Sequence, residues 1–206
     1  MVGSVGTMNS LTMTDTRLVI EHTRAWLERA VIGLNLCPFA KAVHVKQQVR
    51  YVVSQARDTT ALQAALVAEL LWLAAADPDE VDTTLLIHPG VLQDFADYND
   101  FLDLADEALA QTDLEGVLQV ASFHPRYQFA GTDEHDIGNA TNRSPYPTLH
   151  LLREASLDRA VVAFPDPEAI FEANIATLNS LGPSGWNELE RQCLLDAHEQ
   201  LKGSAT

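Results

Sequence analysis

The sequence predicts an α/β fold, a single domain in which helices flank a small, mainly parallel sheet of three to four strands. Three observations support this class. Short segments of β-branched and aromatic residues alternate with longer segments whose apolar residues recur at helical spacing. The connections between the first three strand-like segments are long enough for a crossover helix, which parallel strands require. Finally, 206 residues, 47% of them apolar, suffice for one well-buried core but not for two.

Residues 15–123 supply three strands and the helices around them. The expected elements are, in order, a helix over 15–36, a strand at 50–54, a helix begun at Asp58 or Thr59 and ended at Asp77, a strand at 83–88, a helix opened by Asp94, and a strand at 117–123. The first helix ends before Cys37-Pro38 because the residue before a proline avoids the helical region. The strand at 83–88 is almost continuously apolar, which is typical of a strand covered on both faces.

Residues 124–147 follow neither the helical nor the strand period, although they contain aromatic and arginine side chains. A loop of this length inside a compact domain is usually functional or a misassigned element. Beyond it we expect a helix from about Thr148, a short fourth strand at 160–164, a helix from Asp166-Pro167 to Gly182-Pro183, and a last helix capped by Ser184. Residues 1–13 are expected to form a flexible leader, and residues 14–206 the domain.

Charge and cysteine usage narrow the classes of function. The chain has 13 basic residues against 29 acidic ones, a formal net charge of −16. Nucleic-acid binding relies on clustered Lys and Arg, so we expect neither a nucleic acid nor an anionic membrane as partner. Cys37 and Cys193 form no disulfide framework, the first residues show no signal-peptide pattern, and no apolar run reaches transmembrane length. These features predict a cytoplasmic protein.

Two of the expected strands end in the same dipeptide, His88-Pro89 and His124-Pro125. Proline ends each strand sharply because it cannot donate a hydrogen bond to the ladder. In open parallel sheets, ligands bind outside the carboxyl ends of the strands. If the strands are parallel, both imidazoles project at that edge. We therefore place the candidate site there and in the adjoining segment from Phe123 to Glu154.

That segment concentrates cations in an otherwise acidic chain. Arg126, Arg143 and Arg153 lie within it, and arginine recognises carboxylate or phosphate through two parallel hydrogen bonds. Tyr127 and Asn142 would orient a ligand held in this way. Two interpretations stay open at this point: the arginines bind a small anionic ligand, or they form internal ion pairs that hold the segment in shape.

The histidines support two chemistries. A metal site would use His88, His124 and His150, with Asp136, Glu154 or Cys37 as a further ligand and a divalent transition metal as cofactor. Three imidazoles with an open position are typical of catalytic zinc, whereas two imidazoles and a carboxylate suit non-haem iron. Alternatively, His124 and His150 act as acid and base near neutral pH, and any of the three can instead be a structural histidine. On the expected helix from Thr148, His150 shares a face with Arg153 and Glu154.

Cys37 also has two interpretations. As a catalytic thiolate or a soft metal ligand it needs a nearby cation, such as Lys41 or a histidine, to lower its pKa. Free cysteine is also among the most buried residue types, and LCPF (36–39) has the composition of a core segment.

Four phrases of the sequence resemble a known family. They are CPFA (37–40), DFADYNDFLDLAD (94–106), QVASFHPRYQFAG (119–131) and NATNRSPYPTLHLLREAS (139–156). Together they are similar to the uncharacterised family called domain of unknown function 1415, over about Trp26 to Val162. The resemblance implies a bacterial-type cytoplasmic protein and carries over no catalytic residue. It coincides with the segment selected above on physical grounds.

Two hypotheses for function follow from the sequence. In the first, the protein binds or acts on a small anionic ligand, held by Arg143 and Arg153, with His124 and His150 as acid, base or metal ligands. In the second, the protein is a non-catalytic structural or interaction protein, and the polar segment is an internal hydrogen-bond network. A pocket lined by His124, Arg143 and His150 would favour the first hypothesis. Mutual hydrogen bonding of the same side chains would favour the second.

Overall fold

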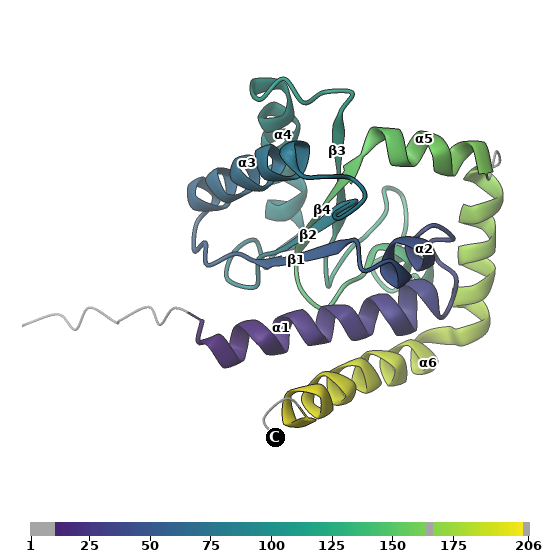
Figure 1. Ribbon diagram of the computed structural model, residues 1–206. Helices are drawn as coiled ribbons and strands as arrows, with labels where there is room; N and C mark the ends of the chain where they lie inside the picture. The colour runs from purple at the N-terminus through teal and green to yellow at the C-terminus, as the bar shows by residue number, and fades with distance from the viewer. Residues whose placement is uncertain (1–10, 164–166, 204–206) are drawn as a thin grey trace, which may run out of the picture.

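Four strands form one mixed sheet in a computed structural model that describes residues 11–163 and 167–203 (Figure 1). The strands are β1 (Val49–Val53), β2 (Thr83–Ile87), β3 (Leu118–Phe123) and β4 (Thr148–Arg153), in the order β1-β2-β4-β3. β1 pairs parallel with β2, and β4 pairs antiparallel with both β2 and β3. The first three strands therefore run in one direction, as predicted from the sequence, but β4 lies between two of them.

β4 replaces the helix that we expected from Thr148, and that prediction is wrong. A short apolar run fits a buried strand as well as a helix, and pairing on both sides decides for the strand. Leu149 and Leu151 are fully buried in the core against one helical layer. Because side chains alternate along a strand, His150 and Arg153 project from opposite faces of the sheet rather than sharing a helix face.

The helices surround this sheet in chain order. They are α1 (Met13–Trp26), a π-helix, η1 (Leu27–Ile32), α2 (Ala40–Val45), α3 (Thr59–Ala75), α4 (Phe95–Gln111), a 3₁₀-helix, η2 (Ile137–Asn142), α5 (Glu154–Ala163) and α6 (Pro167–Gly203). The strand expected at 160–164 is wrong, since residues 160–163 belong to α5. Phe164, Asp166 and residues 1–10 of the expected leader lie outside the described residues. No helix in the described part of the chain is both long and apolar enough to span a membrane.

Two helix starts follow directly from capping chemistry. The carboxylate of Asp58 accepts a hydrogen bond from the Ala61 amide at 2.8 Å, which confirms Asp58 as the cap of α3. The carboxylate of Asp94 accepts one from the Ala96 amide at 2.9 Å and caps α4. Each side chain satisfies an amide of the first turn that has no partner within the helix.

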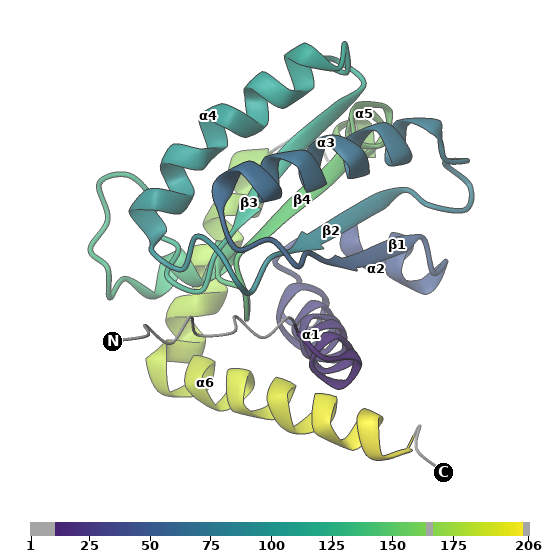
Figure 2. The same ribbon diagram turned by 90° about the vertical axis from the view of Figure 1, so that its left-hand side faces the viewer.

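Helices cover both faces of the sheet. α3 and α4 lie on one face, and α1 with the C-terminal part of α6 lies on the other (Figure 2). The first layer is closed by leucines of α3 that are completely buried: Leu62, Leu66, Leu70 and Leu73. The second layer buries Trp26, Leu178, Trp186 and Cys193. The sheet therefore separates two independent apolar cores.

α6 consists of two helical arms. They meet at Gly182, whose φ of 66° lies in the left-handed region that glycine tolerates, and Pro183 follows directly. The predicted helix boundary at Gly182-Pro183 is thus confirmed. The second arm runs beside α1 (Figure 1).

The helix expected over 15–36 changes its geometry after Trp26. In the π-helix η1, the Gly33 amide donates to the Glu28 carbonyl at 2.9 Å, and the Leu36 amide donates to the Val31 carbonyl at 2.9 Å. These bonds span five residues rather than four. π-helices are rare and occur frequently at functional sites. Here the segment turns Leu27 and Val31 toward the sheet.

The replacement Gly33→Ala tests whether the close backbone packing at the end of η1 requires a glycine. A Cβ atom at Gly33 would lie 2.3 Å from the Arg29 carbonyl oxygen, so the backbone must shift. We expect a loss of about 1–3 kcal/mol in the free energy of unfolding, measured in urea. Gly203→Ala is the control, because a Cβ there meets nothing within 4 Å. Equal stability of the two variants would contradict the prediction.

Candidate functional site

The carboxyl ends of β2 and β3 bring His88 and His124 to the same place, as the strand directions predict. Both side chains are completely buried and pack against Tyr98 from α4. The ring centroid of Tyr98 lies 5.8 Å from that of His88 and 5.0 Å from that of His124. The Tyr98 hydroxyl donates to the Thr148 carbonyl at 2.9 Å and fastens this aromatic group to β4.

Hydrogen bonds determine which nitrogen of each imidazole carries the proton. His124 accepts the Arg126 amide at Nδ1 (3.0 Å) and donates from Nε2 to the Leu92 carbonyl (3.2 Å), so both of its nitrogens are occupied. His88 donates from Nδ1 to the Val91 carbonyl at 3.2 Å, while its buried Nε2 has no partner in the described part of the chain. Burial lowers the pKa of His88 to about 4 and lowers the pKa of His124 as well.

The arginines of the polar loop, residues 124–147, donate to the protein itself. Arg126 donates to the Gln93 carbonyl at 2.7 Å and to the carboxylate of Asp94 at 3.1 Å, which joins the loop to the start of α4. Arg143 donates to the carbonyls of Tyr127 at 3.4 Å and Glu134 at 2.7 Å. These hydrogen bonds hold a long connection in shape, so they fit an internal structural role better than an open anion site.

Asn142 and Asn139 add further hydrogen bonds that hold the polar loop in shape. The Asn142 amide donates to the Ser122 carbonyl at 3.1 Å. Asn139, which the sequence analysis did not select, accepts from the Phe129 amide (3.0 Å) and the Thr132 hydroxyl (2.9 Å) and donates to the Asp133 carbonyl (2.8 Å). It is completely buried. The sequence gives only a general signal for it, because a long connection between two strands needs side chains that satisfy part of its backbone.

Arg153 lies on the opposite end of the sheet from the polar loop and ends α3. Its guanidinium donates to the carbonyls of Leu73 (2.7 Å), Ala76 (2.8 Å) and Val81 (3.2 Å). The last carbonyls of a helix have no partner within it, and a cation there also complements the helix dipole. These bonds give Arg153 a structural role.

The metal-ligand set suggested by the sequence does not converge. His150 projects from the sheet face opposite to His88 and His124, as the register of β4 requires. Asp136 accepts from the Gly138 amide at 2.8 Å and caps η2. Within residues 11–163 and 167–203, no group of three or more His, Cys, Asp and Glu side chains is placed to hold a metal ion.

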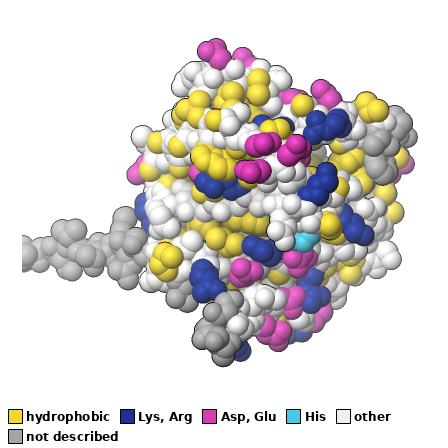
Figure 3. Space-filling view, in the orientation of Figure 1, with side chains coloured by type: hydrophobic (Ala, Val, Ile, Leu, Met, Phe, Trp, Pro, Cys, Tyr) yellow, Lys and Arg dark blue, Asp and Glu magenta, His cyan; other side chains and the backbone are white. Residues whose placement is uncertain are grey.

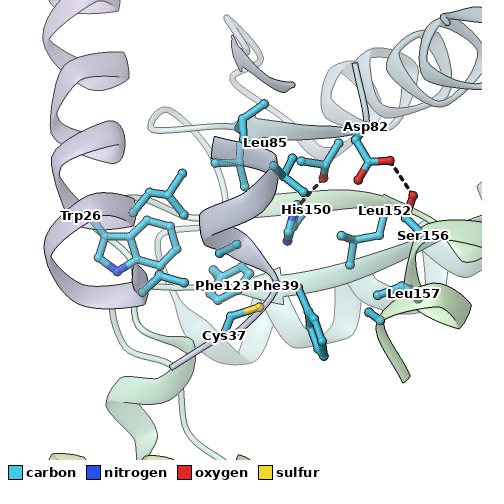
Figure 4. A pocket seen from close by; sticks show the side chains of 17 residues that line it. Trp26, Cys37, Phe39, Asp82, Leu85, Phe123, His150, Leu152, Ser156 and Leu157 are labelled. Carbon is cyan, nitrogen blue, oxygen red and sulfur yellow. Dashed lines mark hydrogen bonds between the residues drawn. The ribbon is translucent and has the colours of Figure 1, made fainter. Parts of the chain in front are cut away.

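His150 and Cys37 instead line one cavity on the α1 side of the sheet, which we call the inner cavity. Its volume is about 170 Å³. The walls are almost entirely apolar and come from α1, η1, α2, α5 and all four strands. They include Trp26, Leu27, Val31, Phe39, Val43, Leu85, Phe123, Leu152, Leu157 and Ala160. Figure 4 shows Cys37, Phe39 and His150 facing the same space.

His150 presents a defined hydrogen-bond acceptor to this cavity. The Thr83 hydroxyl has a single proton and donates it to the Leu151 carbonyl at 2.6 Å. The 2.7 Å contact between Thr83 and His150 is therefore a bond donated by Nε2 of the imidazole. Nδ1 keeps its lone pair and has no hydrogen-bond partner among the described residues. Burial lowers the pKa of His150 to about 4, so the ring is neutral at physiological pH.

The two cysteines differ in their surroundings. Cys37 is half-buried and lines the inner cavity. Cys193 is buried in the core between α1 and α6, and burial raises its pKa to about 11. Cys37 is thus the thiol that a molecule in the inner cavity would contact.

Replacing Arg153 by leucine should destabilise the protein strongly. The variant leaves three carbonyls near the end of α3 without their charged donor. We expect a loss of about 2–4 kcal/mol in the free energy of unfolding. Arg191→Leu is the matched control, because Arg191 forms only an exposed pair with Glu188 and should cost less than about 1 kcal/mol. A small effect at Arg153 would show that it is not a helix cap.

The buried imidazole of His88 predicts a loss of stability in mild acid. Its pKa is about 4 in the folded chain against an ordinary 6.5, so below pH 6.5 the unfolded chain binds the proton first. Stability is then lost as pH falls from about 6.5 to about 4. Between pH 7 and pH 5, His88→Gln should lose about 2 kcal/mol less than the wild type. His135→Gln, at an exposed position, should keep the wild-type dependence.

Comparison with known proteins places the chain in a family. The family model described as "Protein of unknown function (DUF1415)" matches residues 18–188, a range that holds all four strands, the polar loop and the walls of the inner cavity. Comparison with curated proteins and with solved structures gives no match. The chain belongs to the DUF1415 family.

Proposed function

We propose that this protein binds a small apolar molecule, or the apolar part of a larger one, in the inner cavity. The observation that carries the proposal is the cavity itself: an apolar space with one imidazole acceptor directed into it. Ligand sites are typically concave and apolar, with a few polar groups that fix orientation.

The size of the inner cavity sets the size of the group it accepts. An apolar cavity of roughly 150 Å³ in another protein binds benzene, so about 170 Å³ accommodates one aromatic ring or a short branched chain. Trp26 and Phe123, whose ring centroids lie 5.3 Å apart, supply aromatic wall on one side.

The imidazole of His150 supplies orientation. Because Nε2 is held by Thr83, Nδ1 accepts a hydrogen bond from a hydroxyl or amine of the ligand. A neutral imidazole avoids the cost of an unpaired charge among apolar walls. A ligand with one hydrogen-bond donor beside an apolar group fits this arrangement best.

The polar loop supports the proposal indirectly. Its arginines and asparagines bond to the protein, and the carbonyl of Arg143 accepts the indole N–H of Trp26 at 2.9 Å. The loop therefore holds one wall of the inner cavity in place. This favours a supporting role for Arg126 and Arg143 over the binding of a free anion.

Filling the inner cavity should abolish binding. The probe is 3-phenylpropan-1-ol, whose ring and hydroxyl match the walls and His150. At ten times its dissociation constant it should raise the melting temperature of the wild type by roughly 3–6 °C and slow alkylation of Cys37. Ala160→Phe places a ring in the cavity and should remove both effects.

The control is Val162→Phe, two residues further along α5 at a position 83% exposed to solvent. It should respond to the probe as the wild type does. The proposal fails if the wild type shows neither effect, or if the two variants lose the response equally.

A further inference from the structure

A second hollow adjoins the inner cavity and differs from it in chemistry. This outer hollow has a volume of about 580 Å³ and lies between α2, the turn before β2, and α5. Five residues line both spaces: Phe39, Val43, Asp82, Ser156 and Ala160. A molecule with its apolar end in the inner cavity would therefore place its other end in the outer hollow.

The outer hollow is lined by charged groups of both signs. Lys46, Arg159, Asp79 and Asp82 are its charged lining residues. Figure 3 shows basic and acidic side chains close together on this face of the molecule, between α5 and α2. The four charges balance, whereas the whole chain carries a net charge of −16. An anion in this hollow therefore meets much less electrostatic repulsion than it would on the average surface of the chain.

Hydrogen bonds already occupy part of this set. The Arg159 guanidinium donates to the Ser156 hydroxyl at 2.8 Å, and that hydroxyl donates to the carboxylate of Asp82 at 2.5 Å. Neither Lys46 nor Arg159 has a carboxylate within salt-bridge distance among the described residues. One Asp82 oxygen is therefore occupied by the Ser156 hydroxyl, while the two cations keep donors available.

We propose that the ligand is an apolar monocarboxylate, with its carboxylate in the outer hollow at Lys46 and Arg159. This inference rests on the proposed function, since the apolar body occupies the inner cavity. Arginine and lysine both bind carboxylates through charge-assisted hydrogen bonds. A carboxylate brings one negative charge to a set whose own charges sum to zero, whereas a phosphate dianion would bring two and be repelled more strongly by the two aspartates.

Calorimetric titration of the full chain with three probes that share one phenylpropyl skeleton tests this inference. They are 3-phenylpropanoate, 3-phenylpropan-1-ol and phenylalanine, which share a ring and differ in the polar end. We expect the carboxylate to bind at least tenfold more tightly than the alcohol, because charge-assisted hydrogen bonds to Lys46 and Arg159 outweigh the single bond to His150 that only the alcohol can donate. Its advantage should shrink as salt is raised, because exposed charges are screened.

Variants separate the charge from the cavity. Lys46→Ala and Arg159→Ala should each weaken the carboxylate about five- to tenfold and change the alcohol less than twofold. Arg159→Lys retains the charge and should retain most of the affinity. Lys41→Ala, on α2 but outside both lining sets, is the matched control and should have no effect.

Each outcome decides between the two proposals. If the alcohol binds as tightly as the carboxylate, the monocarboxylate inference is overturned and the apolar cavity function stands. If phenylalanine binds more tightly than 3-phenylpropanoate, its ammonium is recognised beside Asp79, and the ligand is a zwitterion rather than a monocarboxylate. If no probe binds the wild type, the proposed function itself fails.

Discussion

The architecture depends on one strand, β4, inserted antiparallel between two strands that run the other way. Phe123 at the end of β3 pairs with Thr148 at the start of β4, so the chain leaves and re-enters the sheet at the same point. The segment between them, residues 124–147, therefore leaves the sheet and returns to it at the same end. Its backbone lies outside the ladder, so its hydrogen bonds come from tight turns, as from the Tyr127 amide to the His124 carbonyl, and from side chains such as that of Asn139. The density of Arg and Asn in that segment is the result.

The sheet also divides the chemistry of the molecule. On the α4 side, His88 and His124 are sealed among aromatic rings, with His124 bonded through both nitrogens. On the α1 side, His150 keeps one nitrogen open toward an apolar space. Histidines that look equivalent in the sequence therefore have separate roles, because strand alternation sends neighbouring side chains to different cores.

Local chemistry made much of the fold predictable, and long-range packing limited the rest. Asp58 and Asp94 predict the starts of two helices, and Gly182-Pro183 predicts the break within α6. The His-Pro dipeptides predict where two strands end. The prediction of a helix from Thr148 is wrong because three leucines in six residues, Leu149, Leu151 and Leu152, do not distinguish a strand from a helix, and pairing with β2 and β3 decides for the strand. The inner cavity could not be predicted, since its walls come from segments remote in sequence. Thr83, which fixes the tautomer of His150, carries no sequence signal at all.

The junction of β4 and α5 contains no spacer. Arg153 is the last residue of the strand and Glu154 the first of the helix, and the Glu154 amide donates to the Val117 carbonyl at 3.0 Å. α5 forms one side of both the inner cavity and the outer hollow, so that side is mounted directly on the sheet. Swinging α5 outward as a rigid body would pull Arg153 away from the end of α3 on the opposite face. The base of α5 is thus anchored through the sheet, and the freedom of this wall grows only with distance from Glu154.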